Sequence, residues 1–421
     1  MNIINKKFSL RKIAVIFLVS FLWISCSVNK ADEGSDFTVI NNEGELSSRL
    51  DTLDIDIEVD TTETAASSKT FFKKTPSFDL KLIAELTPPE VNGSPVQATM
   101  VSILGGSARA AVSYNERGLA YKGAIDILQL PSGNSRNLRI RSGILFDNAD
   151  VNAVHVNENR IWSALASESS KLVDEGEYSV IRQFSFNGFS ISGESEVNAS
   201  LPGFAANSTK EFGDNVFITS GDNAGLSVFN LDLSEQIAFI RITDARWVDV
   251  NDDWVVVLSG GDNGSLHKYD RASLQLIETY SFGGADTPEA KNTVEIVGNL
   301  AMIAAGKSGT HIMDLTNGQL LANIPIPDPA RLGLSPDVVT TNAVSAEEEY
   351  IFISNGEAGV YVAEANLNLN EFRSGQNLTV DLIGQLKFDE KQSVNHVSYR
   401  GNNLIIATGL GGIKAVRLSR K

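Results

Sequence analysis

The stretch that decides the fold is Asn342-Ala-Val-Ser-Ala followed by Tyr350-Ile-Phe-Ile-Ser354, then Gly356-Glu-Ala-Gly359 and Val360-Tyr-Val-Ala363. Short apolar or alternating runs of this kind are typical of β-strands, because successive side chains of a strand point to opposite faces. The glycines between the last two runs supply the positive φ that a tight hairpin requires. The segment therefore predicts short strands joined by hairpins.

The same arrangement recurs along the chain with a constant spacing. Each copy opens with an Asn or Arg, here called the lead residue, and its second apolar run begins eight residues later. The lead residues are Asn152, Asn207, Arg246, Asn292, Asn342 and Asn395, and the second runs begin at Arg160, Asn215, Trp254, Leu300, Tyr350 and Asn403. A more divergent first copy spans residues 96–145. Seven copies of four short strands, with a period of about 50 residues, have the dimensions of propeller blades.

The two ends of the repeated region predict how the ring closes. The last copy ends after its third strand, at Val416-Arg-Leu-Ser419, and the alternating segment 79–87 precedes the first copy. Pairing these two strands would complete the seventh blade and remove two exposed edges, which otherwise promote aggregation. The expected fold is an all-β, seven-bladed β-propeller over residues 77–421 that is closed by an N-terminal strand.

One copy carries a family resemblance. The unit that contains Arg246-Trp-Val-Asp-Val250 and Trp254-Val-Val-Val-Leu258 resembles the LVIVD repeat of bacterial surface β-propellers, and the resemblance covers nearly all of residues 77–421. Third strands such as Thr310-His-Ile-Met-Asp314 differ from the Leu-Val-Ile-Val-Asp that names the repeat. The resemblance implies a propeller fold and brings no enzymatic activity with it.

The N-terminus has the layout of an export signal. Four basic residues within positions 6–12 precede an apolar run over residues 13–24, which is about half the length of 20 residues that a membrane span needs. The run ends in Leu22-Trp-Ile-Ser-Cys26, which resembles the lipobox of bacterial lipoproteins, with Trp23 as a departure. The resemblance implies a signal peptide over residues 1–25, lipid attachment to Cys26, and an outer-membrane location, with exposure at the cell surface as one arrangement. Because Cys26 is the only cysteine, a disulfide framework is excluded.

Residues 26–76 form the next unit of the sequence. Positions 27–68 contain eleven acidic and two basic residues, and such a segment buries little apolar area, so it predicts a flexible acidic tether. Within it, residues 53–60 alternate between apolar and acidic side chains. As a strand this stretch would present an acidic face, either for Ca²⁺ or simply solvated or loosely docked.

Three positions after each lead residue stands a polar residue on the expected first strand of the blade, which lines the central channel. These channel residues are His155, Lys210, Asp249, Glu295, Ser345 and Ser398. Lactonase-like propellers hold a divalent cation in the channel with such groups, and His155, Asp249 and Glu295 have suitable chemistry. The alternative is a solvated lining. The lead residues either face a ligand at the channel mouth or bond to nearby backbone.

Composition and motifs limit the function. A formal net charge of −17 argues against a nucleic-acid partner. The sequence contains no Gly-x-Ser-x-Gly, His-Glu-x-x-His, phosphate-binding loop or dinucleotide fingerprint. It therefore predicts an envelope-anchored lipoprotein whose propeller binds a protein or a glycan, without catalytic residues or a cofactor. The alternatives are a metal-dependent, lactonase-like hydrolase with calcium or another divalent cation, and a structural partner in an outer-membrane complex.

Overall fold

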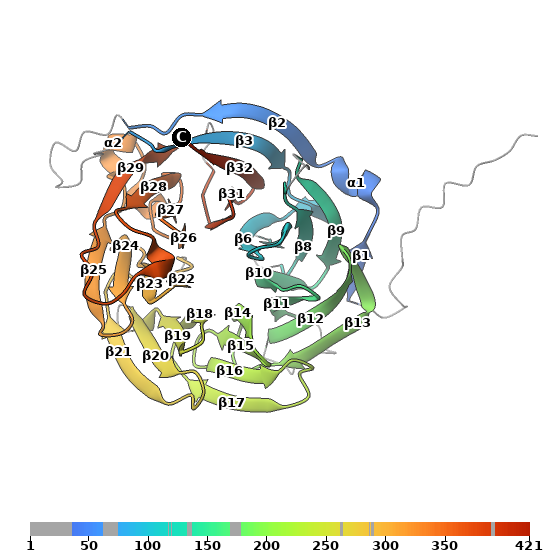
Figure 1. Cartoon of the computed structure of the whole chain (residues 1–421). Helices are drawn as coiled ribbons and strands as arrows, with labels where there is room; N and C mark the ends of the chain where they lie inside the picture. The colour runs from blue at the N-terminus through green and yellow to red at the C-terminus, as the bar shows by residue number, and fades with distance from the viewer. Residues whose placement is uncertain are drawn as a thin grey trace, which may run out of the picture.

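The computed structural model describes residues 36–61, 75–116, 118, 120–132, 137–168, 178–261, 264–285, 287, 290–388 and 392–421. Seven antiparallel sheets stand side by side around a central axis (Figure 1). The chain thus forms a seven-bladed β-propeller, as the repeats predict. The predicted export segment and Cys26 lie outside the described residues.

The first six blades each contain four strands that are consecutive in sequence, from the axis outward. Blade 1 comprises β6 (Gln97–Ile103), β7 (Arg109–Asn115), β8 (Gly123–Gln129) and β9 (Arg139–Phe146), and blade 2 comprises β10 (Ala149–Val156), β11 (Arg160–Ser167), β12 (Ser179–Asn187) and β13 (Ser190–Ser200). Blade 3 comprises β14 (Ala206–Phe212), β15 (Asn215–Ser220), β16 (Gly225–Asn230) and β17 (Gln236–Arg241), and blade 4 comprises β18 (Ala245–Val250), β19 (Trp254–Ser259), β20 (Ser265–Asp270) and β21 (Leu276–Ser281). Blade 5 comprises β22 (Val294–Val297), β23 (Leu300–Ala304), β24 (Thr310–Asp314) and β25 (Gln319–Ile324), and blade 6 comprises β26 (Ala343–Glu347), β27 (Tyr350–Ser354), β28 (Val360–Ala365) and β29 (Val380–Leu386).

Blade 7 is assembled from both ends of the described chain. It contains β30 (His396–Arg400), β31 (Asn403–Ala407), β32 (Ile413–Arg420) and, outermost of the four, β3 (Phe78–Leu86). β3 pairs antiparallel with β32 from Phe78 opposite Arg420 to Leu86 opposite Ile413. The segment that the sequence singles out at 79–87 therefore pairs with the C-terminal strand.

The repeated glycines lie in turns between second and third strands, where close backbone contacts require them. A Cβ on Gly309 would lie 2.1 Å from the Ile324 carbonyl oxygen, and one on Gly412 would lie 1.9 Å from the Leu86 carbonyl oxygen. Both glycines also have positive φ. Ile324 ends the fourth strand of blade 5 and Leu86 ends β3, so β3 occupies the fourth-strand position of blade 7.

The prediction of a flexible tether over residues 26–76 is wrong for residues 36–61. β1 (Phe37–Ile40) pairs with β9 as a fifth strand of blade 1, α1 (Glu43–Ser47) follows, and β2 (Leu50–Ile57) pairs with β3 as a fifth strand of blade 7. This segment runs along the outside of the ring (Figure 1). The physical reason is that it satisfies exposed strand edges with backbone hydrogen bonds, which its acidic composition does not prevent.

The remaining elements are short and lie between strands. β4 (Glu90–Val91) and β5 (Ser94–Pro95) form a hairpin before blade 1, α2 (Pro329–Leu332) and the 3₁₀ turn η2 (Pro336–Val338) connect blades 5 and 6, and the 3₁₀ turn η3 (Leu369–Glu371) lies between β28 and β29. Across the part of the chain that the structure describes, no helix is long and apolar enough to cross a membrane.

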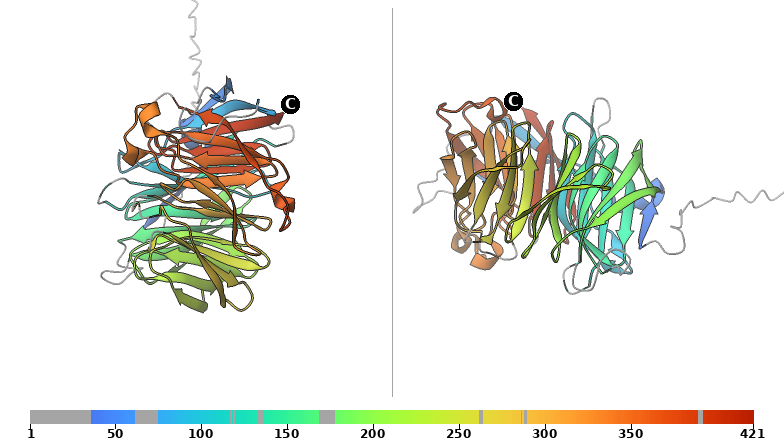
Figure 2. Two further views of the ribbon diagram at one scale, coloured as in Figure 1. Left: turned by 90° about the vertical axis from the view of Figure 1, so that its left-hand side faces the viewer. Right: turned by 90° about the horizontal axis from the view of Figure 1, so that it is seen from below.

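The core lies between neighbouring sheets, whose apolar faces pack against one another around the ring. Trp162 of blade 2 is fully buried, and its indole Nε1 donates to the Glu211 carboxylate of blade 3 at 2.5 Å. Seen from the side, the strands run through the thickness of the ring (Figure 2). The innermost strands therefore bring the lead residues to one end of the channel.

Candidate functional site

The lead residues mark a break in the innermost strands. In blades 2, 3 and 4 the pairing register shifts at Asn152, Asn207 and Arg246, and in blade 1 it shifts at Thr99. Such bulges re-aim a side chain out of the regular pleat. Thr99 is thus the lead residue of blade 1, which the sequence does not reveal because a threonine replaces the asparagine.

Most lead side chains bond to the backbone of the next blade. The amide Nδ2 atoms of Asn152, Asn207, Asn342 and Asn395 donate to the carbonyl oxygens of Ala206, Ala245, Val394 and Ala98 at 2.9, 3.0, 3.1 and 2.9 Å. In blade 1, the Thr99 hydroxyl donates to the Val151 carbonyl oxygen at 3.2 Å. These bonds link neighbouring blades, including blade 7 to blade 1. The lead residues are therefore primarily structural.

Arg246 holds the connection between blades 4 and 5. Its Nη1 donates to the carbonyl oxygens of Thr287 and Ala290 at 3.1 and 3.2 Å, and also to the Asn292 side chain. Its Nε and Nη2 face the Asp244 carboxylate, with Nη2 at 2.8 Å. Because its donors are largely used inside the protein, Arg246 positions this connection and the residues that follow it.

A cavity of about 290 Å³ opens at this end of the channel, here called the lead-end cavity. Its lining comprises Asn115, Asn152, Asn207, Asp244, Arg246, Trp247, Ala290 and Lys291. Of the six predicted lead residues, Asn152, Asn207 and Arg246 are in this lining, whereas Asn292, Asn342 and Asn395 are not. The arc of blades 1 to 4 therefore forms the mouth.

Lys291 reaches across this mouth. It belongs to the connection that enters blade 5, yet its Nζ donates at 2.9 Å to the carbonyl oxygen of Asn152 in blade 2. Burial lowers the pKa of Lys291 to about 8. Among the described residues no carboxylate forms an ion pair with it, so its positive charge is balanced only by a backbone dipole. Of the described cations that line the lead-end cavity, Arg246 has a carboxylate partner and Lys291 has none.

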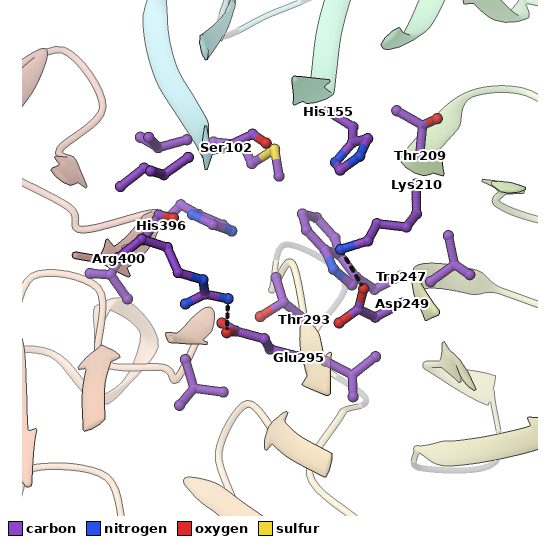
Figure 3. Close-up of a pocket in the computed structure, with 18 residues that line it drawn as sticks. Ser102, His155, Thr209, Lys210, Trp247, Asp249, Thr293, Glu295, His396 and Arg400 are labelled. Carbon is purple, nitrogen blue, oxygen red and sulfur yellow. Dashed lines mark hydrogen bonds and ion pairs between the residues drawn. The ribbon is translucent and has the colours of Figure 1, made fainter. Parts of the chain in front are cut away.

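The channel residues surround a second, smaller cavity of about 110 Å³, here called the far-end cavity (Figure 3). His155, Lys210, Asp249, Glu295 and Ser398 line it, together with Ser102, which lies three positions after Thr99. Ser345 is buried beside them, where its hydroxyl accepts from the backbone N–H of Tyr399 at 3.0 Å. The structure therefore brings together the polar residues that the repeat spacing singles out.

The carboxylates of the far-end cavity are paired with cations. Lys210 Nζ lies 2.8 Å from Asp249 Oδ1, and Arg400 pairs with Glu295. Asp249 Oδ2 also accepts the backbone N–H of Ile296 at 2.8 Å. Burial raises the pKa of Glu295, and the positive charge of Arg400 acts in the opposite sense. These carboxylates are satisfied by the protein itself.

Two histidines in the channel are neutral at physiological pH. Burial lowers the pKa of His155 and of His396 to about 3. The positive charge of Lys210 lowers the pKa of His155 further, and that of Lys291 does the same for His396. The His396 ring stacks on Trp247 of blade 4, with centroids 5.7 Å apart. Trp247 lines both cavities, so it forms part of the wall between them. Both side chains are buried.

The arrangement does not fit a divalent-cation site. Within the described ranges no three His, Cys, Asp or Glu side chains gather closely enough to hold a metal ion. His155, Asp249 and Glu295 share a cavity without forming such a group, and both carboxylates face cations instead. Lys81 of β3 places its Nζ 2.6 Å from Asp54 and 3.6 Å from Asp56 of β2, so the alternating acidic face is also partly neutralised.

Several site residues escape sequence reasoning. Lys291 directly precedes the lead residue Asn292, and Arg400 lies five positions after Asn395. Extending the repeat comparison one position upstream of the lead residues and two positions downstream of the channel residues brings both cations into view. Trp247 and His396 each follow a lead residue directly, and both line the far-end cavity.

Comparison with known proteins identifies the fold and no family. No protein-family model matches the sequence, and no curated protein matches it either. The structure described as the WD40 repeats of RRP9 has a TM-score of 0.54 and 11% identity, covering 77% of this chain and 95% of that one. The U3-55K structure has a TM-score of 0.53 and 9% identity, with 76% and 95% covered. BamB from Moraxella catarrhalis has a TM-score of 0.46 and 12% identity, with 87% and 97% covered. The first two likenesses support the propeller fold.

Proposed function

We propose that this chain is a non-catalytic binding module, an LVIVD-like propeller lipoprotein held at the bacterial cell envelope through Cys26. The observation that carries the binding role is the contrast between the two cavities. At the far end the ionisable groups neutralise one another in pairs, whereas the lead end has the larger cavity and a lysine whose charge is not matched by a described carboxylate. Ligands bind in concave sites that offer a few polar groups with free bonding capacity. The lead end meets that description.

The anchoring part of this proposal rests on the sequence. Lipid attachment at Cys26 would place acyl chains in the membrane, with about 0.8 kcal/mol for each buried CH₂ group. The test is fractionation of cells that express the wild-type chain or Cys26→Ala. We expect the wild type in the outer-membrane fraction and the variant in the soluble fraction. A variant that stays with the membrane overturns the anchor.

The single cysteine also permits a test of the binding face. In the Cys26→Ala background, Leu410→Cys places one thiol in the β31–β32 turn at the lead end, and Asp252→Cys places one in the β18–β19 turn at the far end. Each protein is labelled with a polyethylene glycol maleimide, and its saturable binding to isolated envelopes is measured. We expect the Leu410→Cys label to abolish binding and the Asp252→Cys label to leave it unchanged. The reverse pattern, or no saturable binding by the unlabelled proteins, overturns the proposal.

A further inference from the structure

Three aromatic side chains gather on the loops at the lead end. Tyr121 precedes β8 in blade 1, Tyr178 precedes β12 in blade 2, and Phe204 lies in the connection from blade 2 to blade 3. The rings of Tyr121 and Tyr178 are parallel, with centroids 5.7 Å apart, and Phe204 contacts Tyr178 at 5.2 Å. Phe204 is 51% exposed. Tyr121 and Tyr178 are half-buried. A partly exposed cluster of large aromatic side chains at a loop surface is typical of a binding site.

This aromatic cluster adjoins the lead-end cavity along the backbone. The Glu116 N–H donates to the Lys122 carbonyl oxygen at 2.8 Å, which closes the hairpin between Tyr121 and Asn115 of the cavity lining. Phe204 lies three residues before Asn207, a second lining residue. The arc of blades 1, 2 and 3 therefore carries both the aromatic cluster and the amide side chains of the cavity lining at the lead end.

We infer that this arc binds a short oligosaccharide that ends in a sugar acid, an inference that rests on the proposed function and names its ligand class. Aromatic rings offer flat apolar faces against which the C–H faces of sugar rings pack. The Nδ2 atoms of Asn152 and Asn207 already donate to backbone carbonyl oxygens, so these amides recognise sugar hydroxyls through their oxygen atoms, which accept hydrogen bonds. The Lys291 ammonium, already desolvated, supplies a charge-assisted bond to one carboxylate.

Size and charge restrict the ligand further. A cavity of about 290 Å³ is at the small end of ligand cavities, so it accepts the terminal acidic sugar while neutral sugars lie on the aromatic cluster. The chain has a formal net charge of −17, which repels a polymer with an acid on every sugar. The Asp244 carboxylate of the lining is paired with Arg246, which leaves Lys291 to bind one ligand carboxylate.

The experiment measures binding of short oligosaccharides ending in glucuronic, galacturonic or sialic acid, each beside its neutral parent, by calorimetry with the full chain carrying Cys26→Ala. We expect at least one acidic ligand to bind more than tenfold tighter than its parent, with affinity that falls as salt rises.

Lys291→Met should remove this preference for the acidic ligand. Phe204→Ser should weaken the binding of the acidic ligand and of its neutral parent alike, by at least fivefold. Leu276→Ser, an equally exposed apolar side chain on β21 at the outer edge, is the matched control and should change neither.

The outcomes separate this inference from the proposed function. Binding to envelopes at the lead end without binding to any acidic oligosaccharide overturns the inference and leaves the proposed function standing, with a protein partner in its place. Equal binding of acidic and neutral ligands overturns the role of Lys291. Acidic binding that Phe204→Ser does not weaken overturns the role of the aromatic cluster. Unfolding midpoints of all variants show whether a loss of binding reflects a loss of fold.

Discussion

The two ends of the channel are built from the same repeated strand, yet they treat polar side chains differently. At the far end, ionisable residues of different blades pair with one another, as Lys210 does with Asp249. At the lead end, amides bond to the backbone of the next blade, and Lys291 bonds to a carbonyl oxygen. Buried charges require partners, and an unmatched one costs stability. Both ends therefore link neighbouring blades, but only at the far end are the charges of the described cavity-lining residues matched in pairs, and the proposed binding role of the lead end rests on this contrast.

Breaking a far-end pair should have the largest effect on stability. Glu295→Ala leaves Arg400 in a partly buried place without its carboxylate, which should lower the free energy of unfolding by about 3 kcal/mol. Urea unfolding at pH 7 measures the change. The control is the double variant Glu295→Leu with Arg400→Met, which removes both charges and should lose much less. If the single variant is no less stable than the double one, the pair does not hold the far end together.

The next largest effect is a dependence of the free energy of unfolding on pH, which comes from His396. The folded pKa of His396, about 3, lies below its ordinary value near 6.5, so the unfolded state binds more protons between these values. Stability from this group is therefore complete above pH 6.5 and decreases as the pH falls toward 3.

His396→Gln removes this dependence. Between pH 7 and pH 4.5 the wild type should lose about 2 kcal/mol more than the variant, because the other titrating groups cancel in the comparison. Unfolding in urea at the two pH values gives the difference. Parallel losses in both proteins would mean that His396 titrates normally and that the centre of the channel is solvated.

The sequence predicts those features of the structure that recur in every repeat, and it does not predict contacts that occur in one place only. All six second strands with a lead residue begin at the predicted residue, because eight residues hold one strand and one tight turn in every copy. The same periodicity predicts the channel residues. It does not predict Lys291, because the role of this lysine depends on a contact with Asn152, three blades earlier in the ring, which no local pattern encodes.

The N-terminal segment shows the opposite failure. Composition predicts a solvated tether over residues 26–76, but Arg49 forms a bidentate ion pair with Asp126 of β8, whose side chain is 2% exposed. A single half-buried arginine and two edge-strand pairings outweigh a surplus of exposed carboxylates. The net charge of residues 36–61 reflects their many solvated carboxylates. The buried contacts are made by a few residues that contribute little to that net charge.

A smaller effect should follow from removing one link between blades at the lead end. Thr99→Val deletes the hydroxyl that bonds to Val151 and to Ser113 while keeping the side-chain shape, at a cost of about 1.5 kcal/mol. Thr99→Ser retains the hydroxyl and is the control. The unfolding midpoints of the two variants are compared by thermal unfolding. Equal midpoints would show that blade 1 lacks the lead-residue link proposed for it.

The smallest effect has the opposite sign and separates the two ends most sharply. Burial lowers the pKa of Lys291 to about 8 from an ordinary value near 10.5, so at pH 7 the folded protein holds an ammonium that the unfolded state solvates better. Between about pH 8 and pH 10.5 the unfolded state binds more protons, and stability from this group rises with pH.

Lys291→Met should therefore stabilise the protein by about 1 kcal/mol at pH 7, after the lost bond to Asn152 is included, and the gain should disappear by pH 10. Urea unfolding at both pH values, with Lys421→Met, which replaces an exposed lysine, as the control, tests this. A loss of stability at pH 7 would mean that Lys291 is a structural link like the far-end cations, and the lead end would then have no charge kept for a ligand.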